Sequence, residues 1–329
     1  KPIPLKAKSF DFIEGYEERA FRLLGVNVSG AASTVYERGL PKHIKTTPSS
    51  KTDIPGFVYD MGETTINLHL LGYQPSLGNT VEMYINSPIA SQDEHIVKIN
   101  PETGVGSVTF QQYGSVSGFI RMDYRSMGQF HVAPGETVDL YCDLSHMDYL
   151  AATSNRTEKP AIPVKPLYSD GSVYDCINNL PYDEALSDIR TYSIYTDIRD
   201  YDLTADEYTD QLIKGYEALA GKVEAIDSHP AAKALMIADM KMTCFYALSF
   251  ADYFRLDNYR DAHNKSYDEP VGLILDPVTG KQFDRLADMF DLTDPLLMIC
   301  DDASSLMEIE CDMDNPQKYG NVRYLRPAS

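Results

Sequence analysis

The sequence predicts an α+β multidomain protein in which an antiparallel β-sandwich is followed by an all-helical region. Two patterns lead to this fold class. Between residues 66 and 144, apolar and polar residues alternate with the period of two that is typical of a half-buried antiparallel strand. After about residue 180 the apolar residues recur at helical spacing instead, and most of the net charge of −20 lies in this second half.

Short strands separated by turn-forming residues account for the sandwich prediction. Glycine, proline and asparagine mark turns near residues 75–79, 100–106 and 114–118, and again at Pro134 and Gly135. About six short strands with this spacing are typical of a β-sandwich. The apolar members of the clearest alternating runs are Val81, Met83 and Ile85; Ile120, Met122 and Tyr124; and Val138, Leu140, Cys142 and Leu144.

These patterns divide the chain into five segments. Residues 1–38 are expected to form β-strands that either end an upstream β-domain or pack on the sandwich. Residues 39–56 and 151–167 are expected to be linkers, the second of them rich in proline, because large apolar residues are scarce there. Residues 57–150 should form the β-sandwich, and residues 168–329 an acidic helical domain.

Helix signals appear in the second half of the chain. A first helix is expected at residues 183–198, where apolar residues fall roughly on one face. Thr204, followed three residues later by Glu207, is a capping box, in which each side chain binds the backbone amide of the other residue. The helix that this box opens should end near Asp227.

The segment 231–253 is apolar on nearly all sides, which is normal for a helix at the centre of a bundle. Its methionines and aromatic residues leave a second interpretation open, in which the helix lines a ligand groove. Shorter helices are expected at residues 281–290 and 295–307, the second of which is opened by Asp294 and Pro295.

No motif with a known chemistry stands out. The chain contains no GxSxG, Walker, HExxH or GxGxxG motif. We therefore assign no catalytic, cofactor-binding or metal-binding residue and expect no cofactor, which leaves open whether the chain is an enzyme. Three groups of side chains remain as metal-site alternatives without the spacing of a known site. They are His69, His95 and His131; Asp197, Asp200 and Asp202; and Asp301, Asp302, Glu308, Glu310, Asp312 and Asp314.

The five cysteines give no redox signature, because no two of them lie within three residues of each other. Cys142 falls on the apolar face of a predicted strand, and Cys244 lies within the apolar helix pattern. Both are therefore expected to be core residues rather than reactive thiols. A disulfide between Cys300 and Cys311 remains an alternative.

Composition narrows the classes of partner. An acidic surface repels phosphate groups, so nucleic acid and anionic membranes are not expected as partners. The sequence has no apolar run of about 18 residues, so no transmembrane segment is expected. Tyrosine occurs 23 times and could serve a β-sheet face that binds a glycan or a protein segment, although it also suits β-structure in general.

Four stretches together carry a resemblance to a known family. They are SFDFIEGYEERAFRLLGVNVSG (9–30), LLGYQPSLGNTVEMYINSPIASQDEHIVKINPETG (70–104), VAPGETVDLYCDL (132–144) and YSDGSVYDCINN (168–179). In this order they resemble the N-terminal ectodomain region of Bacteroidetes thiol–disulfide oxidoreductases of the thioredoxin-like TlpA/ResA type.

The resemblance implies an exported protein, periplasmic or associated with the outer membrane and often a lipoprotein. It also implies a catalytic thioredoxin domain with a WCxxC motif after the helical region, and this chain contains no such motif. The expected function is therefore that of a non-catalytic ectodomain that binds or positions a partner. The alternative is a free-standing β-sandwich module of the bacterial cell envelope that binds a glycan or a peptide.

Overall fold

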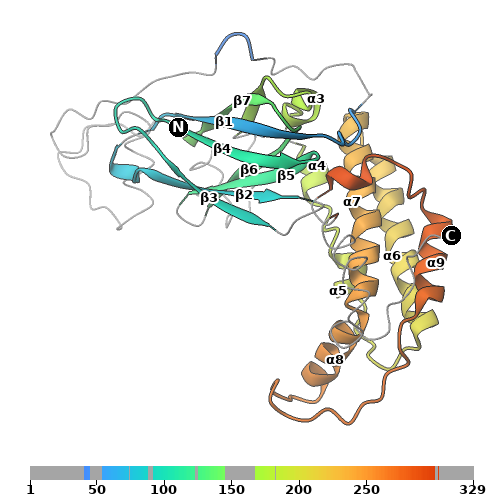
Figure 1. The fold of residues 1–329 in the computed structure, drawn as a ribbon. Coiled ribbons are helices and arrows are strands. Elements are labelled where there is room, and N and C mark those ends of the chain that lie inside the picture. Colours follow the sequence, from blue (N-terminus) through green and yellow to red (C-terminus); the bar gives the residue numbers. More distant parts are fainter. Residues whose placement is uncertain are drawn as a thin grey trace, which may run out of the picture.

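The structure is a computed structural model of an α+β protein, with two β-sheets on one side and most of the helices on the other (Figure 1). It describes residues 41–44, 54–73, 75–87, 92–122, 125–144, 167–181, 183–300 and 303. The strands expected at 1–38, nearly all of the linker expected at 151–167, and the acidic cluster between Asp301 and Asp314 lie outside the described residues.

The first sheet has four strands in the order β4-β1-β7-β8. They are β1 (Met61–Leu71), β4 (Val105–Tyr113), β7 (Thr137–Asp143) and β8 (Leu167–Asp170). The prediction of a purely antiparallel fold is wrong here, because β1 and β7 pair in parallel while the other two pairs are antiparallel. The alternation of apolar and polar residues within a strand does not depend on whether its neighbour runs parallel or antiparallel. The sequence pattern could therefore not predict this parallel pair.

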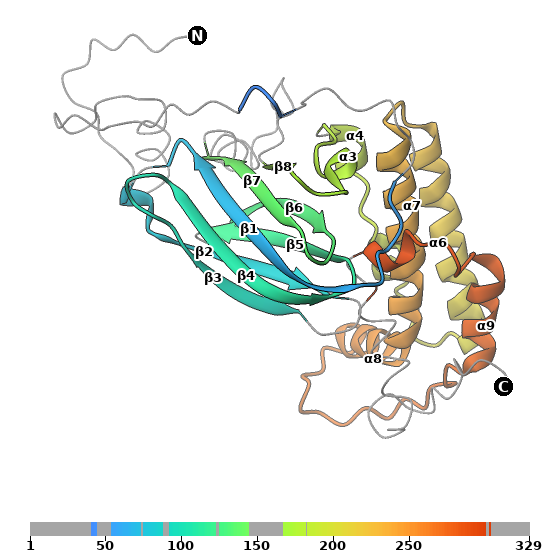
Figure 2. The ribbon, with the colours of Figure 1, turned by 45° about the horizontal axis from the view of Figure 1, so that its top comes forward.

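The second sheet is antiparallel throughout, with the strand order β3-β2-β5-β6. Its strands are β2 (Thr80–Asn86), β3 (Asp93–Lys98), β5 (Val116–Met122) and β6 (Arg125–Val132). A single 3-10 turn, η1 (Pro75–Leu77), leads into β2 at one of the predicted turns. Figure 2 shows the two sheets lying one behind the other.

The inner faces of the two sheets share one hydrophobic core. Ile66 and Leu68 of the first sheet and Met83, Ile120 and Phe130 of the second are all 0% exposed and belong to one cluster. The predicted alternation places these side chains inward, because residues two apart in a strand point to the same face. Burying such side chains contributes about 1.5–3 kcal/mol each relative to exposure.

The sheets extend beyond the segment expected for them. β8 covers residues 167–170, which the sequence analysis gave to the end of the second linker and the start of the helical domain. Four residues are too few to show a period, so this strand had no clear signal. A short helix, α3 (Asp175–Asn178), follows and packs against β8 and β6.

The helix expected at 183–198 is wrong as a continuous element. Two single turns take its place, α4 (Glu184–Ser187) and α5 (Ser193–Thr196). Between them the backbone makes hydrogen bonds of the 3-10 type, in which an amide donates to the carbonyl three residues earlier. The Ile189 amide donates to the Leu186 carbonyl at 3.0 Å, and the Ser193 amide donates to the Arg190 carbonyl at 3.0 Å. Such bonds tighten the chain and interrupt the helix.

The capping box at Thr204 is confirmed. The Glu207 amide donates to Thr204 Oγ1 at 3.2 Å, and the Thr204 amide donates to Glu207 Oε2 at 2.9 Å. The box opens α6 (Ala205–Ala225), which ends two residues before the expected Asp227. Its apolar side, which includes Leu212, faces the second hydrophobic core, formed between the helices.

The apolar segment expected as one helix at 231–253 is divided. α7 (Pro230–Ser249) and α8 (Ala251–Ala262) meet at a bend of 71°. The Ser249 hydroxyl donates to the Phe245 carbonyl at 2.8 Å, and a serine bonded one turn back often bends a helix. No single helix within the described ranges has both the length and the apolar character to cross a bilayer.

The remaining helical elements are short. α9 (Gly280–Met289) confirms the helix expected at 281–290 and packs on α6 and α7. Of the helix expected at 295–307, the described residues include the 3-10 turn η2 (Leu297–Ile299). Asp294 makes a local contact just before this turn, because its Oδ1 accepts from the Leu296 amide at 3.0 Å.

Candidate functional site

A cleft of about 430 Å³ lies where the second sheet meets the helices, and we call it the junction cleft. Its position between two structural units is a common one for binding sites. It is defined by Gly128, Gln129 and His131 of β6; Ile177, Asn178, Leu180, Pro181, Asp183 and Leu186 from the α3–α4 region; Ala232, Leu235, Met236 and Asp239 of α7; and Ile299 and Cys300 at η2.

The junction cleft is mostly apolar and carries negative charge. Leu235 and Met236 contribute apolar groups from α7, and Ile177 does so from the opposite wall. Asp183 and Asp239 are its charged residues, and no lysine or arginine is among the described residues that line it. This combination suits an apolar group that carries, or lies next to, a positive charge.

Tyr174 joins the segment before α3 to the sheets beneath it. Its side chain is fully buried, and its hydroxyl donates to the Gly56 carbonyl at 2.8 Å and shares a 2.6 Å hydrogen bond with Ser115 Oγ. Ser115 Oγ also accepts from the Val58 amide at 2.9 Å. Burial raises the pKa of Tyr174, so this hydroxyl keeps its proton through the neutral range.

Two consecutive asparagines attach α3 to both sheets. Asn178 binds the backbone of His131 on β6, and Asn179 binds the backbone of Ser169 on β8. In each case the side-chain amide both accepts from the backbone N–H and donates to the carbonyl of the same residue, each bond being 2.8 Å long. α3 is thus held across the gap between the edges of the two sheets.

Glu136 fixes the same region from the other side. Its carboxylate accepts from the Ala133 amide at 2.8 Å, from the Ser172 hydroxyl at 2.9 Å and from the Val173 amide at 2.8 Å. The turn after β6 is therefore tied to the segment that leads into α3. Together with the asparagine contacts, this network fixes the wall of the junction cleft before any ligand binds.

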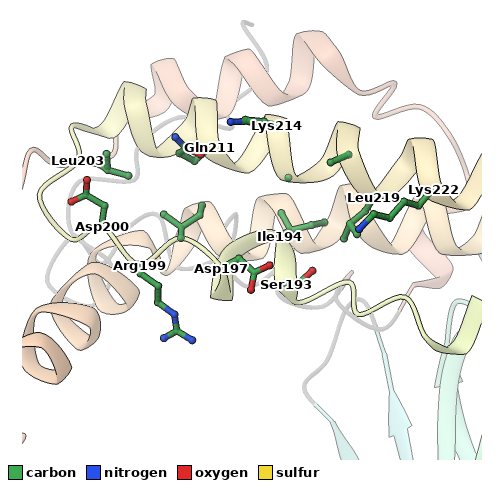
Figure 3. A pocket seen from close by; sticks show the side chains of 13 residues that line it. Ser193, Ile194, Asp197, Arg199, Asp200, Leu203, Gln211, Lys214, Leu219 and Lys222 are labelled. Carbon is green, nitrogen blue, oxygen red and sulfur yellow. The ribbon is translucent and has the colours of Figure 1, made fainter.

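A second pocket of about 430 Å³ lies between α5 and α6 (Figure 3). Lys214 and Lys222 of α6 and Asp197 beside α5 are exposed side chains, and Arg199 points away from α6. At Gly215 the two elements approach closely, because an added Cβ would lie 3.1 Å from the Ile194 carbonyl oxygen. The pocket has an exposed lining of mixed charge, so we favour the junction cleft.

The structure does not bring the histidine alternative together as a metal site. His69 Nε2 lies 3.0 Å from Asp139 Oδ1 and its ring stacks on Tyr141, whereas His95 stacks on Phe110. His131 lines the junction cleft instead. Within the described ranges, no three histidine, cysteine or acidic side chains are close enough to hold a metal ion.

The aspartate alternatives have similar outcomes. Asp200 Oδ1 accepts from the Asp202 amide at 3.0 Å, which is a local turn contact rather than part of a cation site. Together with Asp197, these residues do not meet as a metal-binding group in the part of the chain that the structure describes. The Asp301–Asp314 cluster lies outside the described residues.

The two cysteines expected in the core are buried, as predicted. Cys142 is 1% exposed in β7 and Cys244 is 0% exposed in α7. Burial raises the pKa of the Cys142 thiol, and it raises the pKa of the Cys244 thiol to about 12. Both shifts disfavour the reactive thiolate at neutral pH. Cys300 lines the junction cleft, and Cys311, its expected alternative partner, lies outside the described residues.

On the second sheet, a tyrosine that could contribute to a binding face packs instead against side chains of the neighbouring strand. Tyr84 stacks on Phe119 with ring centroids 4.8 Å apart, and the Arg121 guanidinium lies 5.8 Å from the Tyr84 ring centroid. Comparison with known proteins adds no assignment for this face or for the cleft, since no family model and no curated protein matches the chain.

The sequence analysis did not identify the junction cleft as a site. It left a groove at 231–253 as one of two interpretations, and Leu235 and Met236 do line the cleft. The stretch that contains Asn178 and Asn179 carries part of the family resemblance, but its residue pattern predicts no role for either asparagine. Two adjacent side-chain amides at the end of a short helix are a usable signal, since such side chains bind free backbone groups.

Proposed function

We propose that this chain is a non-catalytic binding module that holds a segment of a partner protein in the junction cleft. The observation that carries the proposal is a preformed, apolar and acidic cleft between a β-sandwich and a group of helices. Sites of this kind recognise their ligands by apolar fit and by a few placed charges.

The cleft chemistry indicates the kind of segment. Leu235 and Met236 offer an apolar wall, and methionine adapts to side chains of different shape. Asp183 and Asp239 would attract a lysine or arginine beside the apolar anchor. We therefore expect an apolar side chain followed or preceded by a basic residue.

The resemblance to the ectodomain region of TlpA/ResA-type oxidoreductases agrees with a binding role. In that setting the module would be exported to the periplasm or the outer membrane and would position a partner for a thioredoxin domain. The chain itself would contribute recognition rather than thiol exchange, in keeping with its deeply buried Cys142 and Cys244.

Selection from a library of random linear peptides tests the proposal. The immobilised chain should enrich peptides that carry a large apolar residue next to lysine or arginine. Met236→Lys should abolish their binding, because it adds a positive charge to the apolar wall. Asp239→Asn should weaken peptides with a basic residue more than matched peptides with alanine in its place.

Met289→Lys provides the matched control. Met289 is 40% exposed at the end of α9, outside the residues that line the junction cleft, so this change should leave peptide binding unaltered. Failure to enrich any sequence class, or equal binding by the Met236→Lys and wild-type chains, would refute the proposed site.

A further inference from the structure

The two borders of the sheets are protected in different ways. At one border, Asn178 occupies the edge of β6 and Asn179 occupies the edge of β8. At the opposite border lie β4 and β3 (Figure 2). Among the described residues, no strand pairs with the outer edge of either one.

β3 packs beside the first residues of β4, where an added Cβ on Gly106 would lie 2.7 Å from the Lys98 carbonyl oxygen. From the exposed Ser107 onward, β4 lacks the features that normally keep an edge strand single. Natural edges carry charges, prolines or bulges that prevent pairing with another chain. β3 follows this rule, since its sequence is DEHIVK. β4 has the sequence VGSVTFQQY, nine residues without a charge or a proline, and its pairing with β1 runs without a register shift.

The backbone direction along β4 follows from two bonds at its start. The Leu70 amide donates to the Gly104 carbonyl at 2.9 Å, so Gly104 and alternate residues after it bond toward β1. The Val105 carbonyl instead accepts from the Asn100 amide at 2.9 Å, away from β1. By the same alternation, the N–H and C=O groups of Ser107, Thr109 and Gln111 point outward.

We propose that the outer edge of β4 pairs with β4 of a second copy of this chain, antiparallel about a two-fold axis at Thr109. This register places Thr109 opposite Thr109 of the second copy, and Ser107 opposite its Gln111. Roughly six backbone hydrogen bonds would form between the outward groups of the two strands. The first sheets of the two copies would become one continuous sheet.

The side chains of this strand suit a second copy of the same chain. Thr109 Oγ1 already lies 2.9 Å from Thr65 Oγ1, and Ser107 Oγ donates to Asn67 Oδ1 at 2.9 Å. The two-fold axis would extend this row of hydroxyl groups across the interface, and threonine pairs are favourable cross-strand neighbours. Ser107, Thr109 and Gln111 are all exposed in the single chain.

Charge also favours β4 as the line of contact. The chain carries a net charge of −20, so two copies repel each other over most approaches. An uncharged strand puts no like charges directly opposite one another. Because salt screens the remaining repulsion, association should strengthen as the salt concentration rises. An interface held by ion pairs would show the opposite dependence.

Sedimentation equilibrium of the whole chain tests the proposal. The wild-type chain should show a monomer–dimer equilibrium, and Thr109→Lys should weaken it by tenfold or more, since two lysines would face each other. In hydrogen exchange, the amides of Thr109 and Gln111 should become better protected as protein concentration increases.

Thr137→Lys is the matched control. Thr137 is an exposed threonine on β7 that lies in register with Thr65, inside the sheet rather than at its edge. This variant should dimerise like the wild-type chain. Should Thr109→Lys lower the melting temperature, Gln111→Lys, at an exposed position of the same edge, serves in its place.

Three results would overturn the proposal. The first is a wild-type chain that remains monomeric up to about 1 mM. The second is a dimer that both edge variants leave unchanged. The third is equal loss of the dimer in the Thr109→Lys and Thr137→Lys variants, which would place the contact elsewhere.

Discussion

The side chain of Asn178 makes the same two hydrogen bonds with the backbone of His131 that a neighbouring strand would make. The His131 amide donates to Asn178 Oδ1 at 2.8 Å, and Asn178 Nδ2 donates to the His131 carbonyl at 2.8 Å. One side chain thereby satisfies the edge of β6 and fixes the adjoining wall of the junction cleft.

Asn178→Ala should therefore destabilise the fold. Both backbone groups of His131 would lose their partner, at a cost of about 1–3 kcal/mol in the free energy of unfolding. Asn79→Ala, at an exposed position before β2, should change it by less than about 0.5 kcal/mol. Urea denaturation of both variants measures the difference. Equal losses in the two would mean that the Asn178 contacts contribute nothing specific.

Tyr208→Phe should stabilise the chain, more so at high pH. The Tyr208 side chain is fully buried, and its hydroxyl has no hydrogen-bond partner among the described residues, so its removal should gain up to about 1 kcal/mol at pH 8. Burial also raises the pKa of Tyr208 above its ordinary value of 10.0.

The sign of the pH effect follows from that direction. Above about pH 10 the unfolded chain releases the Tyr208 proton, whereas the native chain keeps it. The stability of the wild-type chain is therefore unaffected by Tyr208 ionisation below about pH 10 and falls as the pH rises above it. The advantage of Tyr208→Phe should therefore grow above pH 10 in urea titrations. Tyr59→Phe, at a side chain that is 77% exposed, should show no such growth. A constant difference would contradict the assignment.

Phe245→Ala should lower the helical melting transition strongly. Phe245 is 0% exposed near the end of α7 and packs against Phe290 of the same core. Truncating such a side chain costs about 3–5 kcal/mol. Leu235→Ala should cost clearly less, because Leu235 is partly exposed and lines the junction cleft. Thermal unfolding followed by far-UV circular dichroism checks both. If the two variants lowered the melting temperature equally, the assignment of Phe245 to the core and Leu235 to the cleft would be wrong.

The chain should not reduce disulfides. Thiol exchange needs an accessible thiolate, usually with a resolving cysteine nearby, and no two cysteines of this chain lie within three residues of each other. Burial also raises the pKa of Cys142, and it raises that of Cys244 to about 12. An insulin-reduction assay with dithiothreitol should match the control without protein. Turnover above that control, abolished by replacement of a single cysteine, would contradict this prediction.

Sequence patterns identified elements whose signal is local. The capping box at Thr204 specified the start of α6, and the alternation through Met83 and Ile120 specified which side chains form the core between the sheets. They did not reveal the parallel pairing of β1 with β7, because strand direction depends on the whole connection. The bend after Ser249 was also missed, since helix period continues on both sides of it.

The candidate site was less accessible to sequence reasoning than the fold. The junction cleft combines β6, α3 and α7, which are far apart in the chain, so no spacing rule links their residues. Periodicity showed that α7 is apolar, but the division between buried Phe245 and cleft-lining Met236 depends on what packs beside each. The role of Asn178 depends on its hydrogen bonds to the backbone of His131, and the sequence does not show that these two residues are in contact.

The parallel contact between β1 and β7 also constrains the order in which the chain can fold. β1 leaves the ribosome before β7, and the five strands β2 to β6 are synthesised between these two neighbours. During that interval β1 and β4 can form only part of their sheet, with the side that will receive β7 still open. Contacts so distant in sequence slow folding and leave strand edges exposed to aggregation. Completion of the first sheet therefore waits until β7 and β8 have emerged.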